Sequence, residues 1–163
     1  MKGKTPDAAA IAAIGENNAC PLRPPVVQSE NDEWTQAVND MDAHERILSA
    51  LSQVRCGAAC TEAELHALTA RAFEANGVAA VHEAALGPRC RIDFLAEGCI
   101  GVEIKKSRPQ PAALRSQLAR YAACEQVESL IVVAPRGVNL PPCIGGKRVT
   151  MFALERLWGI CLP

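Results

Sequence analysis

The sequence predicts an α/β domain with a mixed central sheet flanked by helices, and three stretches carry that prediction. Residues 61–77 read as a helix with a clear start and stop, residues 91–104 as two short strands, and residues 129–134 as an almost wholly apolar strand. An apolar strand of this kind has no face suited to water, so we expect it in the interior of the sheet. Helices and strands that alternate in this way favour an α/β architecture.

The first 58 residues are expected to precede the main domain. Residues 1–30 contain the run PLRPPVV, which cannot continue a helix or a central strand, and they are predicted to form a flexible arm. Residues 31–58 are predicted to be helical because apolar side chains recur there at helical spacing. Residues 59–163 form the predicted main domain, and the whole chain of 163 residues is about one domain long.

The first helix of the main domain has the sharpest local signal. Thr61 is followed three residues later by Glu64, the pattern of a capping box. An apolar stripe then begins at Leu65, and Asn76-Gly77 is a typical helix stop.

The remaining elements follow from breaks and apolar runs. Glu97-Gly98 predicts a tight turn between the strands Arg91–Ala96 and Ile100–Ile104, which makes them a hairpin. The other predicted elements are a strand at Val78–Val81, a break at Gly87-Pro88, a helix at Ala112–Cys124, the buried strand Ser129–Ala134, a strand near Arg148–Phe152 and a short final helix that includes Trp158.

The predicted hairpin concentrates charge where the chain is otherwise apolar. Side chains alternate between the two faces of a strand, so Glu103 and Lys105 share one face while Val102 and Ile104 point to the other. A turn at Gly98 brings Asp93 within about a residue of the position opposite Glu103. Two carboxylates held together repel each other unless a cation lies between them, and Mg²⁺ prefers such oxygen ligands.

This constellation suits metal-assisted hydrolysis of a phosphodiester. The metal would polarise the phosphate and lower the pKa of a bound water. Lys105 is expected to orient that water and stabilise the transition state. The carbonyl of Ile104, between the two side chains, is a further candidate metal ligand.

The pattern D-x9-E-x-K, between an acidic helix and a helix followed by a buried strand, resembles the PD-(D/E)XK nuclease superfamily. The resemblance covers about residues 61–134 and implies a restriction-endonuclease-like αβββαβ core. Ile92 stands where the family name has proline. The next helix carries Gln117 and Tyr121, which resemble the QxxxY motif of RecB-like and phage-exonuclease-like members and lie on one helix face.

The resemblance also implies a glutamate on the first helix as part of the catalytic and metal-binding set. Glu62 and Glu64 both qualify, and Glu62 is preferred because Glu64 has a capping role; Glu83 is a third candidate. The cofactor is then Mg²⁺, for which Mn²⁺ would substitute.

The resemblance implies a DNA hydrolase, and small stand-alone members often act as homodimers on duplex or branched DNA, as Holliday-junction resolvases do. A single-strand exonuclease and an RNA-directed nuclease remain open. From a different class, the chain could be a non-catalytic DNA-binding or assembly module that keeps the nuclease fold.

Charge is distributed unevenly around a net charge of −1. Residues 30–76 hold three basic and nine acidic side chains, whereas residues 77–163 hold eleven basic and seven acidic ones. A basic back half suits a protein that meets phosphate with one face. The candidate DNA contacts are Arg91, Lys106, Arg108, Arg115 and Arg120.

The remaining expectations concern location and cysteines. No apolar run reaches the roughly 18 residues of a membrane span, and the N-terminus does not read as a signal peptide, so a cytoplasmic location is expected. The eight cysteines are expected to be reduced thiols that pack as small apolar side chains, since none forms a CxxC pair, and a metal site and occasional disulfides are the alternatives.

Overall fold

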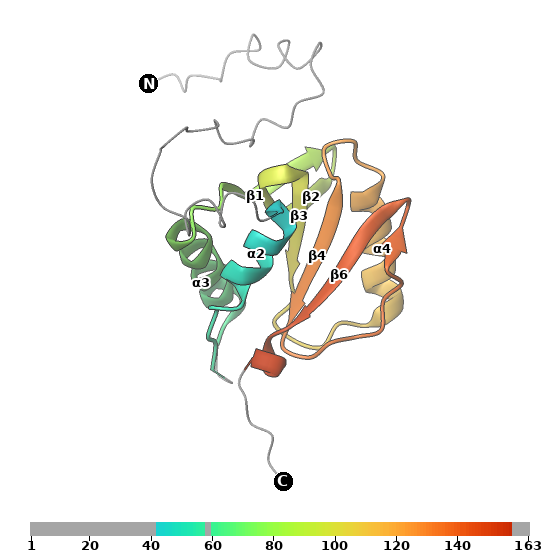
Figure 1. Ribbon diagram of the computed structural model, residues 1–163. Coiled ribbons are helices and arrows are strands. Elements are labelled where there is room, and N and C mark those ends of the chain that lie inside the picture. Colours follow the sequence, from blue (N-terminus) through green and yellow to red (C-terminus); the bar gives the residue numbers. More distant parts are fainter. Residues whose placement is uncertain (1–41, 58–59, 158–163) are drawn as a thin grey trace, which may run out of the picture.

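The computed structural model describes residues 42–57 and 60–157, and it shows an α/β fold with three helices and an open, six-stranded mixed sheet (Figure 1). The helices are α2 (Ala43–Leu51), α3 (Glu62–Ala75) and α4 (Pro111–Ala122). The strands are β1 (Ala80–Gly87), β2 (Cys90–Ala96), β3 (Ile100–Ile104), β4 (Ser129–Ala134), β5 (Cys143–Ile144) and β6 (Lys147–Ala153). Two short 3-10 helices, η3 (Glu97–Cys99) and η4 (Leu154–Leu157), complete the described part.

The sheet has the strand order β1-β2-β3-β4-β6-β5. Strand β2 is antiparallel to both of its neighbours, β1 and β3, whereas β3, β4 and β6 run parallel, and the short β5 is antiparallel to β6. The predicted hairpin and the predicted mixed sheet are therefore both present. The apolar strand β4 lies between β3 and β6, and five of its six residues are buried, as expected.

Helices cover both faces of the sheet (Figure 1). On one face α2 and α3 pack against the sheet through a core that includes Ile47, Leu65 and Phe73. On the other face α4 packs through Leu114 and Leu118. All five residues of β3 are buried, because this strand is covered from both sides.

Helix α3 begins and ends where its sequence predicts. The Thr61 side chain accepts a hydrogen bond from the Glu64 backbone N–H, and the Glu64 carboxylate accepts one from the Thr61 backbone N–H, so the capping box is complete. Asn76 is the C-cap, and Gly77 follows with φ of 66°, a conformation that glycine adopts without strain.

Several element boundaries differ from the sequence prediction. Strand β1 runs to Gly87 instead of ending at Val81, because it pairs with nearly all of β2. The final helix is the 3-10 turn η4, and Trp158 lies outside the described residues. Strand β5 was not predicted, since two residues are too few to show a pattern.

The predicted arm of residues 1–30 lies outside the described residues, as do residues 31–41 of the predicted helical segment. The described remainder of that segment forms α2, whose buried His44 donates to or accepts from the Thr150 hydroxyl on β6 over 3.0 Å. No helix in residues 42–57 and 60–157 has the length and apolar character needed to cross a bilayer.

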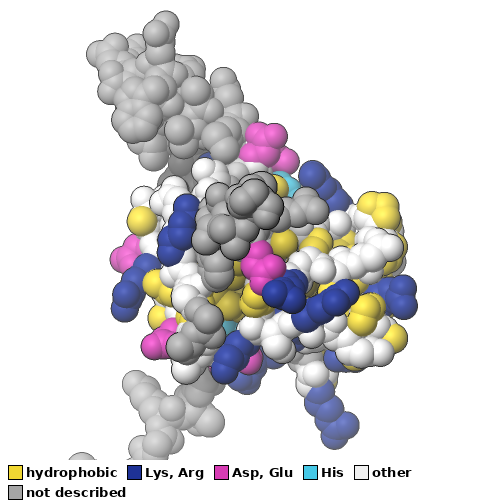
Figure 2. Space-filling model, turned by 90° about the horizontal axis from the view of Figure 1, so that it is seen from below, with side chains coloured by type: hydrophobic (Ala, Val, Ile, Leu, Met, Phe, Trp, Pro, Cys, Tyr) yellow, Lys and Arg dark blue, Asp and Glu magenta, His cyan; other side chains and the backbone are white. Residues whose placement is uncertain are grey.

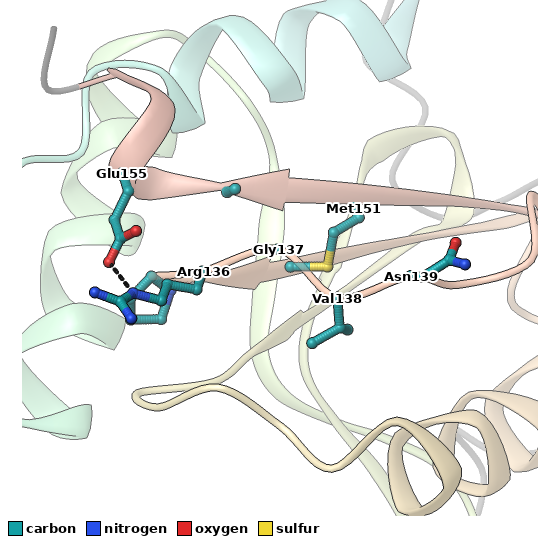
Figure 3. A pocket seen from close by; sticks show the side chains of 8 residues that line it. Arg136, Gly137, Val138, Asn139, Met151 and Glu155 are labelled. Carbon is teal, nitrogen blue, oxygen red and sulfur yellow. Dashed lines mark hydrogen bonds and ion pairs between the residues drawn. The ribbon is translucent and has the colours of Figure 1, made fainter. Parts of the chain in front are cut away.

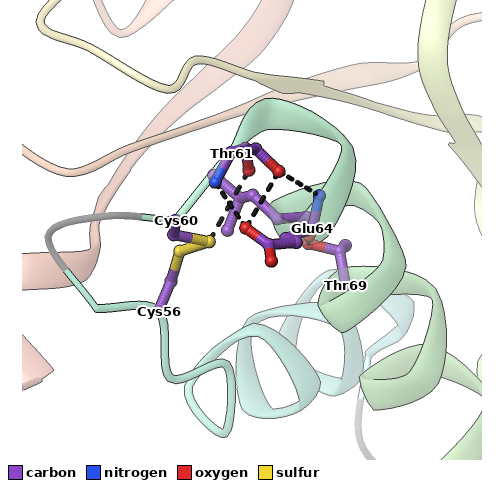
Figure 4. The surroundings of a disulfide bond; sticks show 6 residues. Cys56, Cys60, Thr61, Glu64 and Thr69 are labelled. Atoms are coloured by element: carbon purple, nitrogen blue, oxygen red, sulfur yellow. Dashed lines mark hydrogen bonds between the residues drawn. A yellow bond between two sulfur atoms is a disulfide. The ribbon is translucent and has the colours of Figure 1, made fainter.

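The expectation of reduced cysteines is wrong for Cys56, Cys60 and Cys99, which are disulfide-bonded. Cys56 and Cys60 form a disulfide bond beside the start of α3 (Figure 4). The two cysteines are four positions apart in the sequence. Cys90, Cys124 and Cys143 are free thiols, whereas Cys20 and Cys161 lie outside the described residues.

Candidate active site

The hairpin of β2 and β3 brings the two predicted carboxylates side by side. Phe94 pairs with Val102 and Ala96 with Ile100, so the same register places Asp93 opposite Glu103. Asp93 Oδ2 accepts a hydrogen bond of 2.6 Å from the Ile104 backbone N–H. The carboxylate of β2 is thus held directly at the end of β3.

Strand β2 changes face at Asp93. Ile92 packs in the core on the α4 side, whereas Phe94 packs in the core on the α3 side, although residues two apart in a regular strand share a face. The neighbouring strand is irregular at the same level, where Glu83 has φ of 50°. A non-glycine residue in this region is strained, and the two distortions together let Asp93 reach across to β3.

Glu103 is the most enclosed charged group of the site. The residue is 2% exposed, and its Oε1 accepts hydrogen bonds from Lys105 Nζ at 2.5 Å and from Gln117 Nε2 at 2.7 Å. Its second oxygen, Oε2, is buried and has no hydrogen-bond partner. Burial, and next the nearby charge of Asp93, raise the pKa of Glu103, while Lys105 opposes them.

Helix α4 supplies the polar side chains that meet Glu103. Gln117 and Tyr121 are one helical turn apart, and Gln117 Nε2 also donates to the Tyr121 hydroxyl at 2.7 Å. Tyr121 is 4% exposed, so the ring belongs to the core while the hydroxyl faces the site. Burial and the charge of Glu103 raise the pKa of Tyr121, so the phenol stays protonated at neutral pH.

His66 on α3 lies at the site but was not among the predicted site residues. Its Nε2 lies 3.7 Å from Asp93 Oδ2, is buried, and has no hydrogen-bond partner. Its Nδ1 is 3.0 Å from His82 Nε2 on β1, and both rings pack around Phe94. The one available signal was spacing, since His66 lies one turn after Glu62 on the same helix.

The glutamates proposed to complete the site lie at its rim. Within the described residues no hydrogen bond or ion pair joins Glu62 to Asp93 or Glu103, and Glu62 is exposed at the start of α3. Glu62 and Glu83 line a hollow of about 580 Å³ together with His66 and His82. Glu83 forms an exposed ion pair of 3.0 Å with Arg91, and Glu64 is occupied by the capping box.

The basic side chains lie on the surface around the site. Lys106, Arg108, Arg115 and Arg120 are all exposed. Arg120 lines a hollow of about 590 Å³ that also includes Lys105 and Gln117, so this hollow opens next to Glu103. Figure 2 views the lower end of Figure 1, where η4 follows β6, and shows Lys and Arg side chains scattered over that face among acidic and apolar ones.

A third hollow, of about 480 Å³, lies where β4 and β6 end (Figure 3). Arg136 donates to Glu155 over 2.9 Å across its mouth, and Met151 and Val138 supply its apolar wall. Both members of the ion pair are well exposed, so the pair adds little to stability.

Asp93 and Glu103 are the residues able to hold a divalent cation. No group of three or more His, Cys, Asp or Glu side chains with metal-binding geometry occurs in residues 42–57 and 60–157, so an ion would depend on these two carboxylates and on water. The buried, unpartnered Oε2 of Glu103 fits such an ion, because a charged oxygen without a donor is costly to bury. Carboxylate oxygens are the ligands that Mg²⁺ prefers.

No protein-family model, curated protein or solved structure matches this chain. The fold and the site together define an α/β protein in which a carboxylate pair, a lysine and a glutamine meet at the carboxyl end of β3.

Proposed function

We propose that this protein is a metal-dependent nuclease that hydrolyses DNA phosphodiester bonds, and that α3, β1, β2, β3, α4 and β4 form a restriction-endonuclease-like core. One observation carries the proposal. Asp93 and Glu103 come from adjacent strands, and the buried Glu103 keeps one oxygen without a partner beside Lys105 and Gln117. A purely structural carboxylate would be expected to have both oxygens satisfied.

Asp93 and Glu103 would hold Mg²⁺ or Mn²⁺, with the Ile104 carbonyl as a further candidate ligand. When bound, the ion would polarise the phosphate and make water a stronger nucleophile near neutral pH. Glu62 is exposed and would have to reach the ion through water or through a change of rotamer.

Lys105 is suited to hold a phosphate oxygen or the attacking water. Its side chain is 29% exposed, so one side of the ammonium faces solvent while the other contacts Glu103. An ammonium in this position stabilises negative charge that develops on the phosphate. Gln117 keeps Glu103 in place through its hydrogen bond, and Tyr121 keeps Gln117 in place in turn.

The exposed basic side chains form a surface to which the proposed DNA substrate can bind. Lys106 and Arg108 follow directly after Lys105, and Arg115 and Arg120 are on α4. Phosphate contacts of this kind bind DNA without regard to sequence and weaken as salt rises. A homodimer would place two such sites on a duplex or branched substrate.

A non-catalytic DNA-binding module is the second candidate, and one observation favours it. Lys105 and Gln117 already satisfy Glu103 Oε1, and the Ile104 N–H satisfies Asp93 Oδ2. The site is therefore partly neutralised by its own hydrogen bonds. Such a module would bind DNA and leave it intact.

Cleavage of supercoiled plasmid and of a branched DNA substrate tests the proposal. Wild type is assayed with Mg²⁺, with Mn²⁺ and with a chelator, beside Asp93→Asn and Lys105→Ala. Asparagine still accepts the Ile104 hydrogen bond, so Asp93→Asn removes charge with little change of shape. Arg71→Ala, an exposed basic side chain on α3, is the matched control.

We expect metal-dependent cleavage by wild type and Arg71→Ala, and a loss of at least about 100-fold in the two site variants. Cleavage that persists in both site variants would refute the assignment of the residues. Salt-dependent DNA binding by wild type without cleavage in either metal would favour the non-catalytic module.

A further inference from the structure

Two free thiols from distant parts of the chain face each other on the α4 side of the sheet. Cys90 is the first residue of β2, and Cys124 lies two residues beyond the end of α4. Their sulfur atoms are 3.7 Å apart, although 34 residues separate them in sequence. Both side chains are partly buried, and neither is in a disulfide.

The position of this thiol pair relates it to the candidate site. Cys90 lies three residues before Asp93, and Cys124 lies three residues after Tyr121. The pair therefore links the strand that carries one carboxylate to the helix that orients the other. The end of α4 is held by further contacts, because the Cys124 carbonyl accepts a hydrogen bond of 2.6 Å from Lys147 Nζ.

We propose that Cys90 and Cys124 form a reversible disulfide that locks α4 onto β2. The oxidant is a small-molecule disulfide of the glutathione type. One cysteine thiolate attacks it and releases one small thiol, and the other cysteine then displaces the second from the mixed disulfide. Two protein thiols and one small disulfide thus become one protein disulfide and two small thiols, which carry away both protons.

Formation of this disulfide requires little movement of the two side chains. The sulfur atoms must approach from 3.7 Å to the disulfide bond length of about 2.05 Å, a change that rotation of the two side chains can supply. Cys143 has no such arrangement: it is exposed on β5, and no thiol partner is seen for it in the described part of the chain.

The crosslink would act on stability more strongly than the Cys56–Cys60 disulfide does. Cys56 and Cys60 are only four positions apart in the sequence (Figure 4), whereas Cys90 and Cys124 are 34 positions apart. A longer closed loop removes more freedom from the unfolded chain. Burial, and next the hydrogen bond with Cys124, raise the pKa of the Cys90 thiol, so attack by Cys90 on the small disulfide is slow at neutral pH.

The test uses the full chain, fully reduced and then equilibrated with oxidised glutathione at pH 8. Alkylation of the remaining thiols, digestion and mass spectrometry look for a linked peptide that contains Cys90 and Cys124. Thermal unfolding of the oxidised and reduced forms gives the change in Tm. From the loop length we expect the Cys90–Cys124 bond to raise Tm by about 10 °C.

Serine variants distinguish the effect of the Cys90–Cys124 bond from that of the other cysteines. Cys90→Ser and Cys124→Ser should lose the linked peptide and the corresponding part of the Tm increase, whereas Cys143→Ser should keep both. The proposal is overturned if no linked peptide forms under conditions that oxidise Cys56 and Cys60. It is equally overturned if the Tm increase of wild type persists in both Cys90→Ser and Cys124→Ser. Neither readout depends on DNA cleavage, so the outcome is independent of the proposed nuclease function.

Discussion

Replacing Glu103 with glutamine should make the protein more stable in the absence of metal. The carboxylate is 2% exposed, and its Oε2 has no hydrogen-bond partner. A buried polar atom without a partner costs about 1–3 kcal/mol, and more when it is charged. Glutamine keeps the shape and an oxygen that accepts from Lys105 and Gln117, but it removes the charge.

The raised pKa of Glu103 also predicts that Glu103→Gln stabilises the protein in the absence of metal. Because this pKa is raised in the folded protein, the folded state binds the proton more tightly than the unfolded chain does. Stability contributed by the group is therefore complete below its unfolded pKa and is lost as pH rises through the folded pKa. Above that pH the ionised Glu103 is a cost, which the substitution removes.

We expect Glu103→Gln to gain about 1 kcal/mol once the weaker bond to Lys105 is counted, which raises Tm by about 2–4 °C. The assay is thermal unfolding at pH 7.5 with a chelator and again with excess Mg²⁺. Metal should stabilise wild type, by about 2.7 kcal/mol at a hundredfold excess over Kd, and should leave the variant nearly unchanged.

Glu97→Gln is the matched control. Glu97 is also 2% exposed, but its Oε1 accepts a hydrogen bond of 2.7 Å from Arg46 Nε. Loss of its charge should therefore destabilise the fold by about 1–3 kcal/mol, with no dependence on metal. If Glu103→Gln instead lowers Tm as Glu97→Gln does, and metal does not stabilise wild type, then the Lys105 contact is structural and our reasoning about the site is refuted.

Three further predictions concern stability and activity. Burial lowers the pKa of His44, so the unfolded chain gains a proton below about pH 6.5 that the folded protein binds less readily. The free energy of unfolding should therefore fall as pH drops below about 6.5. Urea unfolding between pH 7.5 and 5 should show a smaller fall for His44→Gln than for wild type. A Cβ on Gly101 would lie 2.6 Å from Ile92 Cδ1, so Gly101→Ala should cost about 1–3 kcal/mol in urea unfolding, whereas Gly57→Ala, in open space, should not. Tyr121→Phe should lower the free energy of unfolding by about 0.5–1.5 kcal/mol, because the hydrogen bond from Gln117 is lost. In the plasmid assay it should lower cleavage less than Lys105→Ala does. An equal loss of cleavage would make the hydroxyl a catalytic group.

Local sequence signals predicted the parts of the fold that depend on near neighbours. The capping box of Thr61 and Glu64 fixes the start of α3 by contacts within one helical turn. The short connection at Gly98 fixes the register of β2 and β3, which is why the sequence placed Asp93 within about a residue of the position opposite Glu103. The Gln117–Tyr121 spacing likewise predicted a shared helix face, and their side chains are hydrogen-bonded.

Other features of the candidate site have no local signature. The change of face at Asp93 depends on two strands distorted at the same level, and neither distortion is encoded by residue spacing. The preference for Glu62 rested on resemblance, and the structure leaves that side chain exposed while His66 lies beside Asp93. Two residues one turn apart share a helix face, so which of them reaches the site depends on where α3 lies along the sheet.

The sequence by itself determined the α/β class, the hairpin, the buried strand and the candidate residues of the site, because helix caps, turns and apolar periodicity act over a few residues. Only the tertiary structure decided which groups are left unsatisfied and which meet. The unpartnered oxygen of Glu103, the approach of His66 to Asp93 and the contact of Cys90 with Cys124 each require segments that the chain brings together from a distance. Such contacts follow from how the layers pack, and packing depends on the whole set of side chains at once.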